Sequence, residues 1–214
     1  MKQAYLLTAA GALAALAAAT PASAAPSAAS VYEAGRCIVD SDRRIAASLL
    51  RNLPLDSRPA DLSGLRGGRA SGCNPGPGVP AMVMRGALAQ ELFLRDFRSF
   101  GVEPRNPDRL VNLNLPVQTY GAVGSSAPGD LYRWSDCVVR NDTANTERLL
   151  RSRVGSSEEA NAISGLQSYM TACIAADSQL SVRSSELRSV IAQSAYYSMY
   201  RYWLGDLRTA RSER

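Results

Sequence analysis

Apolar side chains recur at helical spacing along most of the chain, and the pattern is clearest at about residues 80–97 and about residues 183–207. Both stretches carry aromatic residues at positions i, i+4 and i+7, which places each set on one face of a helix. They are Phe93, Phe97 and Phe100 in the first stretch and Tyr196, Tyr200 and Trp203 in the second. The pattern therefore predicts a long helix in each stretch, and shorter helices are predicted at about 30–40 and 130–140.

Polar residues mark where further helices begin. Asp42 and Asp142 are suitable N-caps for helices that carry a Leu-Leu-Arg triplet. The run Ser156-Ser157-Glu158-Glu159 is typical of a capping box and predicts a helix that continues to about Ile174. We expect the corresponding helix of the first part of the chain to start at Pro59, although nearby glycines lower its helix propensity. Together these patterns predict an all-α, mainly helical fold class.

The helical pattern occurs twice. The same number of positions separates Cys37 from Cys73 and Cys137 from Cys173, and the residues between them align in part. After the second cysteine the register shifts slightly, as a loop insertion would require. The aligned residues are Leu49-Leu50-Arg51 with Leu149-Leu150-Arg151, Arg85 with Arg188, and Ala89-Gln90 with Ala192-Gln193. We interpret this as two degenerate tandem repeats, residues 25–99 and 130–207.

The two repeats are separated by residues 100–129, which are rich in Pro, Gly and Asn and read as a linker over the surface. Within it, Val111-Asn112-Leu113-Asn114-Leu115 alternates between apolar and polar residues, which is compatible with one short strand. Residues 208–214 are expected to be a frayed tail.

The first 24 residues have the layout of a secretory signal peptide. Lys2 precedes an apolar run from about Leu6 to Ala19, and Ala22-Ser23-Ala24 is a suitable cleavage site. An uncleaved membrane anchor needs about 20 apolar residues, and this run is shorter. We therefore expect a periplasmic or secreted protein with no transmembrane segment after cleavage.

An even number of cysteines in an exported protein favours disulfides. Four cysteines allow three connectivities. The internal repeat selects among them, because pairing within repeats gives Cys37–Cys73 and Cys137–Cys173. A redox role is not favoured, since no two cysteines form a C-x-x-C pair.

The composition excludes several kinds of chemistry. The sequence contains no histidine, which rules out Ser-His-Asp and Cys-His nucleophile systems and disfavours most zinc sites. We expect no metal and no cofactor. Nucleic acid is not expected as a partner either, because the net charge after leader removal is only about +4 and no nucleic-acid-binding motif is present.

Three groups of residues are candidates for a site. Tyr197 and Tyr202 lie off the aromatic stripe, so they are the better candidates for an exposed binding surface, whereas the stripe itself is expected to pack the core. The second group is an arginine cluster at the start of the second repeat, and Arg140 and Arg151 are its candidate binding residues. The cluster either binds anionic groups or is simply a solvated helix face. The cluster comprises Arg133, Arg140, Arg148, Arg151 and Arg153. The third group consists of four carboxylates that a polysaccharide hydrolase would pair across a groove, namely Glu33, Glu91, Asp130 and Glu186.

The second repeat carries a further resemblance. It is similar to secreted proteins of alphaproteobacteria, especially sphingomonads, in the stretches Trp134 to Asp142, Leu149-Leu150, Ser156 to Ala160, Cys173 and Leu187 to Tyr196. The first repeat matches only loosely and lacks the Ser-x-Glu-Glu start at Pro59-Ala60-Asp61. The resemblance implies that the protein is exported and that its helical unit is repeated. It implies no activity.

Taken together, these observations favour a non-enzymatic exported module that binds a protein or a cell-envelope component. The alternatives are a carboxylate-dependent hydrolase of envelope polysaccharide and a carrier of a small apolar ligand. No catalytic residue can be assigned from the sequence.

Overall fold

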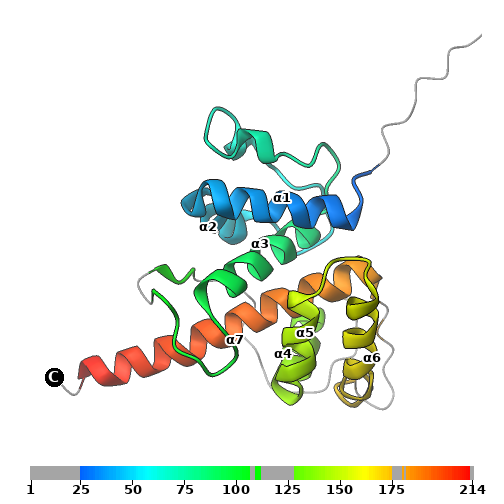
Figure 1. The fold of residues 1–214 in the computed structure, drawn as a ribbon, viewed down its shortest axis with the longest axis vertical. Coiled ribbons are helices and arrows are strands. Elements are labelled where there is room, and N and C mark those ends of the chain that lie inside the picture. The colour runs from blue at the N-terminus through cyan, green and yellow to red at the C-terminus, as the bar shows by residue number, and fades with distance from the viewer. Residues whose placement is uncertain (1–24, 107–108, 112–127, 175–179, 181, 213–214) are drawn as a thin grey trace, which may run out of the picture.

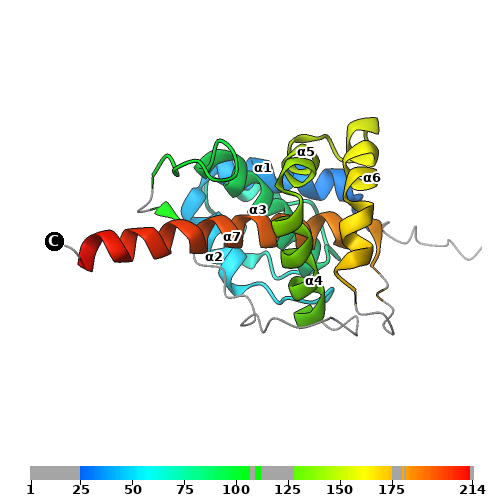
Figure 2. The ribbon, with the colours of Figure 1, turned by 90° about the horizontal axis from the view of Figure 1, so that it is seen from below.

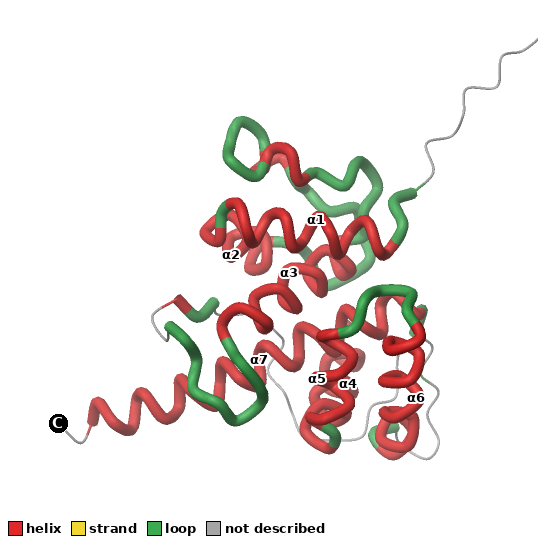
Figure 3. Tube along the Cα trace, in the orientation of Figure 1, coloured by secondary structure: helices red, strands yellow, loops and turns green. Residues whose placement is uncertain are grey.

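The computed structural model describes residues 25–106, 109–111, 128–174, 180 and 182–212, and these residues form α-helices joined by loops and short 3₁₀ turns (Figures 1 and 3). The all-α fold class is confirmed for this part of the chain. The predicted signal peptide lies outside the described residues. Most of the candidate strand does too, because Val111 is the last residue described before the gap at 112–127.

The N-terminal half contains helices α1 (Ala28–Ser41), α2 (Arg43–Asn52) and α3 (Ala81–Asp96). As predicted, Asp42 caps α2: its carboxylate accepts hydrogen bonds from the backbone N–H groups of Arg44 and Ile45, at 2.9 and 3.2 Å. Such a cap satisfies backbone donors that have no partner within the helix.

The helix expected to start at Pro59 is absent, and that prediction was wrong. Two 3₁₀ turns, η1 (Ser63–Leu65) and η2 (Ser71–Cys73), occupy this stretch of the described chain. The backbone around Pro59 is instead extended and pairs with the residues before α3, where the Ala60 N–H donates to the Val79 carbonyl at 2.7 Å. Gly67 adopts φ +74°, a left-handed conformation that ends any helical path there.

The C-terminal half contains α4 (Pro128–Asn141), α5 (Thr143–Arg151), α6 (Ser157–Ala172) and α7 (Ser184–Ser212). Asp142 caps α5 through the Asn145 N–H, and Ser156 caps α6 through the Glu159 N–H, as predicted. The Glu159 carboxylate reaches back to the Gly155 N–H, one residue before the position expected in a capping box. Helix α7 continues to Ser212, past the predicted end at Leu207.

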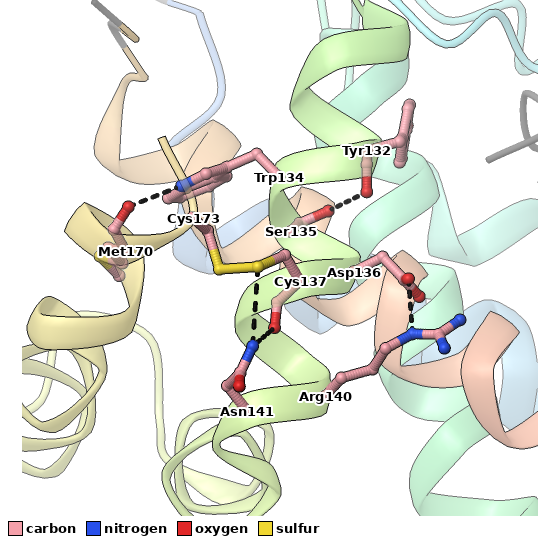
Figure 4. The surroundings of a disulfide bond; sticks show 9 residues. All are labelled: Tyr132, Trp134, Ser135, Asp136, Cys137, Arg140, Asn141, Met170 and Cys173. Carbon is pink, nitrogen blue, oxygen red and sulfur yellow. Dashed lines mark hydrogen bonds and ion pairs between the residues drawn. A yellow bond between two sulfur atoms is a disulfide. The ribbon is translucent and has the colours of Figure 1, made fainter. Parts of the chain in front are cut away.

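Each half contains one disulfide, and both predicted pairings are confirmed. Cys37–Cys73 links α1 to η2 with a Cα–Cα distance of 5.4 Å, and Cys137–Cys173 links α4 to the end of α6 at 5.9 Å (Figure 4). Beside the second disulfide, the Trp134 indole N–H donates to the Met170 carbonyl at 2.9 Å. This hydrogen bond fixes α6 against α4 close to the cross-link.

Helices α3 and α7 lie side by side at the centre of the molecule (Figures 1 and 2). Helix α1 packs on the outer side of α3, and α4 packs on α7. Gly86 marks the closest approach of the central pair, because a Cβ at this position would overlap the Cα and Cβ atoms of Ser189. The buried apolar residues of both halves form one continuous core through this contact.

Two buried arginines join the halves in a reciprocal way. The Arg85 Nε donates to Gln193 Oε1 at 2.8 Å, and the Arg188 Nε donates to Gln90 Oε1 at 2.9 Å. Each guanidinium also binds backbone carbonyls near the end of the second helix of its own half: Arg85 reaches Leu50 and Leu53, and Arg188 reaches Ser152. These bonds satisfy carbonyls that a helix C-terminus leaves without partners.

Candidate functional site

The aromatic stripe packs the core in part: Phe93, Phe97 and Tyr196 are fully buried, Phe100 and Trp203 are half-buried against the core, and Tyr200 is half-buried outside the core cluster. Tyr196 and Phe97 are fully buried and meet edge to face with ring centroids 5.8 Å apart. Burial, reinforced by the charge of Asp96, raises the pKa of Tyr196 far above its ordinary value. The stripe is therefore structural over these residues.

Tyr202 is the most exposed large apolar residue of the described chain, with 56% of its surface accessible. Its ring meets Trp203 edge to face at 5.3 Å. Tyr197 is only half-buried, and the Arg201 guanidinium lies 5.6 Å from the centre of its ring. Of the two predicted tyrosines, Tyr202 thus presents the larger surface to solvent.

The arginine cluster of the second half does not form one anionic-ligand site. Carboxylates of the same helices pair with three of its members: Asp130 with Arg133, Asp136 with Arg140 and Glu147 with Arg151. Arg148 donates to the Asn145 side chain at 3.2 Å. The solvated-face interpretation therefore fits these residues better than a binding patch.

The candidates Arg140 and Tyr202 nevertheless line the same hollow, which we call the α7 groove. It encloses about 490 Å³. Its walls come from the end of the N-terminal half, from α4 and α5, and from α7, and they are formed by Phe100, Gly101, Arg140, Thr143, Ser198, Met199, Arg201 and Tyr202.

Asp136, a buried carboxylate, organises one wall of the α7 groove. It accepts hydrogen bonds from Arg140 Nε at 2.6 Å and from the Ser198 hydroxyl at 2.9 Å, so that one acid fixes side chains of two helices (Figure 4 shows the contact with Arg140). Charge-assisted hydrogen bonds of this kind hold a guanidinium in a defined orientation. Arg140 is therefore positioned before any partner binds.

The fourth candidate, Arg151, lies elsewhere, in a cleft between the halves that we call the inter-half cleft. It encloses about 360 Å³. Residues of α1, α3 and the loop after α5 line it, namely Ala29, Tyr32, Glu33, Arg36, Gln90, Glu91, Arg151, Ser152, Arg153 and Val154. Two of the four predicted carboxylates, Glu33 and Glu91, thus meet at one cavity.

Glu91 is the unusual member of this cleft. Only 6% of the residue is exposed, and its nearest cation, Arg36, lies 3.8 Å away and is itself largely exposed to solvent. Burial is the main reason why the pKa of Glu91 is raised above its ordinary value. A carboxyl group with a raised pKa keeps its proton to higher pH and can then donate that proton as a general acid.

The remaining two carboxylates lie outside the cleft. Asp130 pairs with Arg133 in α4, and Glu186 accepts a hydrogen bond of 2.7 Å from the Ser57 hydroxyl. Tyr32, which does line the cleft, has its pKa raised to about 12 by burial, so its hydroxyl stays protonated at neutral pH.

The sequence could not distinguish Glu91 from the other acids, because its position on a helix gives no measure of burial. Its alignment with Ser194 in the second half was the only available signal, since an acid that replaces a small polar residue at a core position is unusual.

The described residues contain no group of three or more His, Cys, Asp or Glu side chains arranged to hold a metal ion. Within the same part of the chain, none of the helices combines the length and apolar character that crossing a bilayer requires. The chain matches no protein-family model, no curated protein and no solved structure.

Proposed function

We propose that this protein is an exported, non-enzymatic helical module that binds a protein partner through the α7 groove. The observation that carries the proposal is the pairing of a highly exposed Tyr202 with a pre-oriented Arg140 in one hollow. Tyrosine and arginine are enriched among the residues that contribute most to protein–protein binding.

The shape of the molecule supports this proposal. The C-terminal end of helix α7 projects beyond the rest of the described chain (Figures 1 and 2). A partner docked there would bury the exposed Tyr202 side chain while Arg140 remains fixed by Asp136. Side chains that are already ordered lose less conformational entropy on binding.

Export and duplication are part of the same proposal. Two disulfides suit an oxidising compartment, and the reciprocal arginine–glutamine contacts fit two copies of one unit packed face to face. The alignment of Arg85 with Arg188 and of Gln90 with Gln193 supports the same view.

Site-specific photo-crosslinking in the living cell tests the binding surface. A photoreactive residue in place of Tyr202 is expected to give a discrete protein adduct. The same residue in place of Tyr169, which is 37% exposed on α6, is the matched control and should not. Adding Thr143→Trp, which fills the groove, should remove the Tyr202 adduct. Identical adducts from both positions, or an adduct insensitive to Thr143→Trp, would contradict the proposal.

A hydrolase of envelope polysaccharide is a second candidate, because Glu33 and Glu91 line one cleft and the pKa of Glu91 is raised. In that reaction Glu91 would protonate the leaving oxygen, and Glu33 would act on the opposite side of the sugar. Release of reducing ends from purified peptidoglycan measures it. Glu91→Gln should abolish activity, whereas Glu103→Gln, an exposed acid outside the cleft, should not. Failure of the wild-type protein to release sugars would remove this candidate.

A further inference from the structure

The N-terminal half has a separate hollow lined by five arginines, which we call the arginine groove. It encloses about 980 Å³, more than either hollow described above. Its walls come from the end of α1, from α2 along most of its length, from the loop between η1 and η2, and from the segment 109–111. The lining residues are Ser41, Asp42, Arg43, Arg44, Ala47, Arg51, Gly67, Gly68, Arg69, Arg109, Leu110 and Val111.

The arginine groove carries a large excess of positive charge. Arg43 pairs with Asp96, but no carboxylate of the described residues lies within ion-pair distance of the other four arginines, all exposed: Arg44, Arg51, Arg69 and Arg109. The single acid in the lining, Asp42, is already occupied as the cap of α2. Guanidinium groups stay protonated at all physiological pH values, so this charge is permanent.

Buried polar contacts hold the groove in shape. The Tyr196 hydroxyl donates to Asp96 Oδ2 at 2.9 Å and accepts a hydrogen bond of 2.9 Å from the Val111 N–H, while Arg43 binds the same carboxylate oxygen. One network of buried hydrogen bonds therefore connects α2, α3, α7 and the wall segment at Val111. The Cys37–Cys73 disulfide holds the η2 end of the loop that carries Arg69 against α1.

The positive charge of the groove comes from side chains. The Asp42 carboxylate already accepts hydrogen bonds from the first N–H groups of α2, so the helix N-terminus contributes mainly the Arg43 and Arg44 guanidinium groups of its first turn. A single small anion would leave most of the groove empty and most of its arginines unused. Several linked anionic groups would engage them together.

We propose that the arginine groove binds an extended polyanion, a chain whose repeating units carry phosphate or carboxylate groups. Each guanidinium can bind such a group with two parallel hydrogen bonds. The site is independent of the α7 groove and shares no residue with it. It adds a polymer ligand to the protein partner proposed above.

Binding of fluorescent polyphosphate and of polygalacturonate to the mature protein tests the site. We expect binding that weakens as salt increases, because the polymer releases counterions. The triple variant Arg44→Gln, Arg69→Gln and Arg109→Gln should bind at least about tenfold more weakly, since each arginine loses a charge-assisted contact. The polymer that binds more tightly identifies the anionic group.

The matched control removes the same charge elsewhere. The control variant combines Arg98→Gln, Arg148→Gln and Arg183→Gln. These three arginines are exposed and lie outside both the arginine groove and the inter-half cleft, so this variant should bind nearly as well as the wild-type protein. Equal loss in both variants would mean that only net charge matters and would overturn the site. Binding of anionic lipid vesicles without binding of either polymer would overturn it as well.

A measurement on the wild-type protein avoids any effect of substitution on folding. Phenylglyoxal modifies accessible arginines, and peptide mapping reports each site. Polyphosphate should protect Arg44, Arg69 and Arg109 while leaving Arg98 and Arg148 reactive. Uniform reactivity in the presence of saturating polymer would contradict the proposal.

Discussion

Arg188 is almost fully buried, and its guanidinium donates to four acceptors from three segments. It binds Gln90, the Ser152 carbonyl and hydroxyl, and the Glu159 carboxylate at 2.8 Å, and it lies 5.1 Å from the Tyr32 ring centre. Arg85 occupies the related position in the N-terminal half without an ion-pair partner among the described residues, and burial lowers its pKa. The two arginines thus join the halves by hydrogen bonds, and only Arg188 adds a carboxylate.

Replacing Arg188 by methionine should be strongly destabilising. The substitution leaves the Glu159 carboxylate and the Ser152 carbonyl without their partner, and breaking a buried pair in this way costs about 3–5 kcal/mol. Urea unfolding measures the change. Arg148→Met, on an exposed surface of α5, is the control and should stay within about 0.5 kcal/mol of the wild type. A similar, small effect of both substitutions would show that the Arg188 contacts contribute little.

The raised pKa of Glu91 predicts a pH dependence. Because the folded state holds the proton more tightly than the unfolded state, Glu91 stabilises the fold below its unfolded pKa of about 4.5, and this contribution is lost as pH rises through the higher folded value. Glu91→Gln should therefore gain stability relative to wild type between about pH 4 and pH 7. Thermal unfolding across this range measures the difference. A constant difference would contradict the raised pKa.

At the scale of elements, the contact between α3 and α7 depends on how closely two helices can approach. Gly86 faces the backbone of Ser189, and Gly35 of α1 faces Ala87 on the other side of α3. Helix α3 is consequently buried along almost its entire length. For the packing of these helices, small residues at the crossings matter more than the helix propensity of the surrounding sequence.

Gly86→Ala tests this close approach. The added methyl group would overlap both the Cα and the Cβ of Ser189, so the helices must separate, and we expect a loss of about 1–3 kcal/mol in the free energy of unfolding. Ser189→Gly should not restore stability, because the backbone Cα remains in the way. Gly129→Ala in α4 has open space and should be neutral or stabilising. Equal effects at both glycines would contradict the packing.

The helices were predictable because their signals are local. Asp42, Asp142 and Ser156 act as caps within three residues of their partners, and the aromatic stripe needs only helical period. The prediction of a helix at Pro59 was wrong because backbone pairing with Val79 and the left-handed conformation of Gly67 outweigh the preference of proline for the first turn of a helix. Such pairing joins residues that are distant in sequence and leaves no local pattern.

The candidate site was predictable only in part, for the same reason. Tyr202 and Arg140 do share a groove, but Arg151 does not belong to it. The arginine groove was missed altogether, because its members come from α2, the loop at Arg69 and the segment at Arg109. Conversely, the cluster in the second half was conspicuous in sequence, yet its own helices supply the carboxylates that pair with it.

At the scale of the whole molecule, the two halves share one core. Each half has its own disulfide, but α3 and α7 bury their faces against each other, and the apolar cluster runs through both halves without a break. Neither half can bury the apolar face of its central helix alone, and an apolar face exposed to water lowers stability. The proposed binding surfaces therefore belong to one continuous core, and the proposals rest on the premise that both disulfides are formed and that the protein is exported as predicted.

Peptide mapping under non-reducing conditions, on protein purified from its native host, tests that premise most directly. We predict a processed N-terminus at Ala25, one peptide pair joined by Cys37–Cys73 and another joined by Cys137–Cys173. An N-terminus that still carries residues 1–24, together with free thiols or links between the halves, would contradict both the export and the fold on which the binding proposals rest.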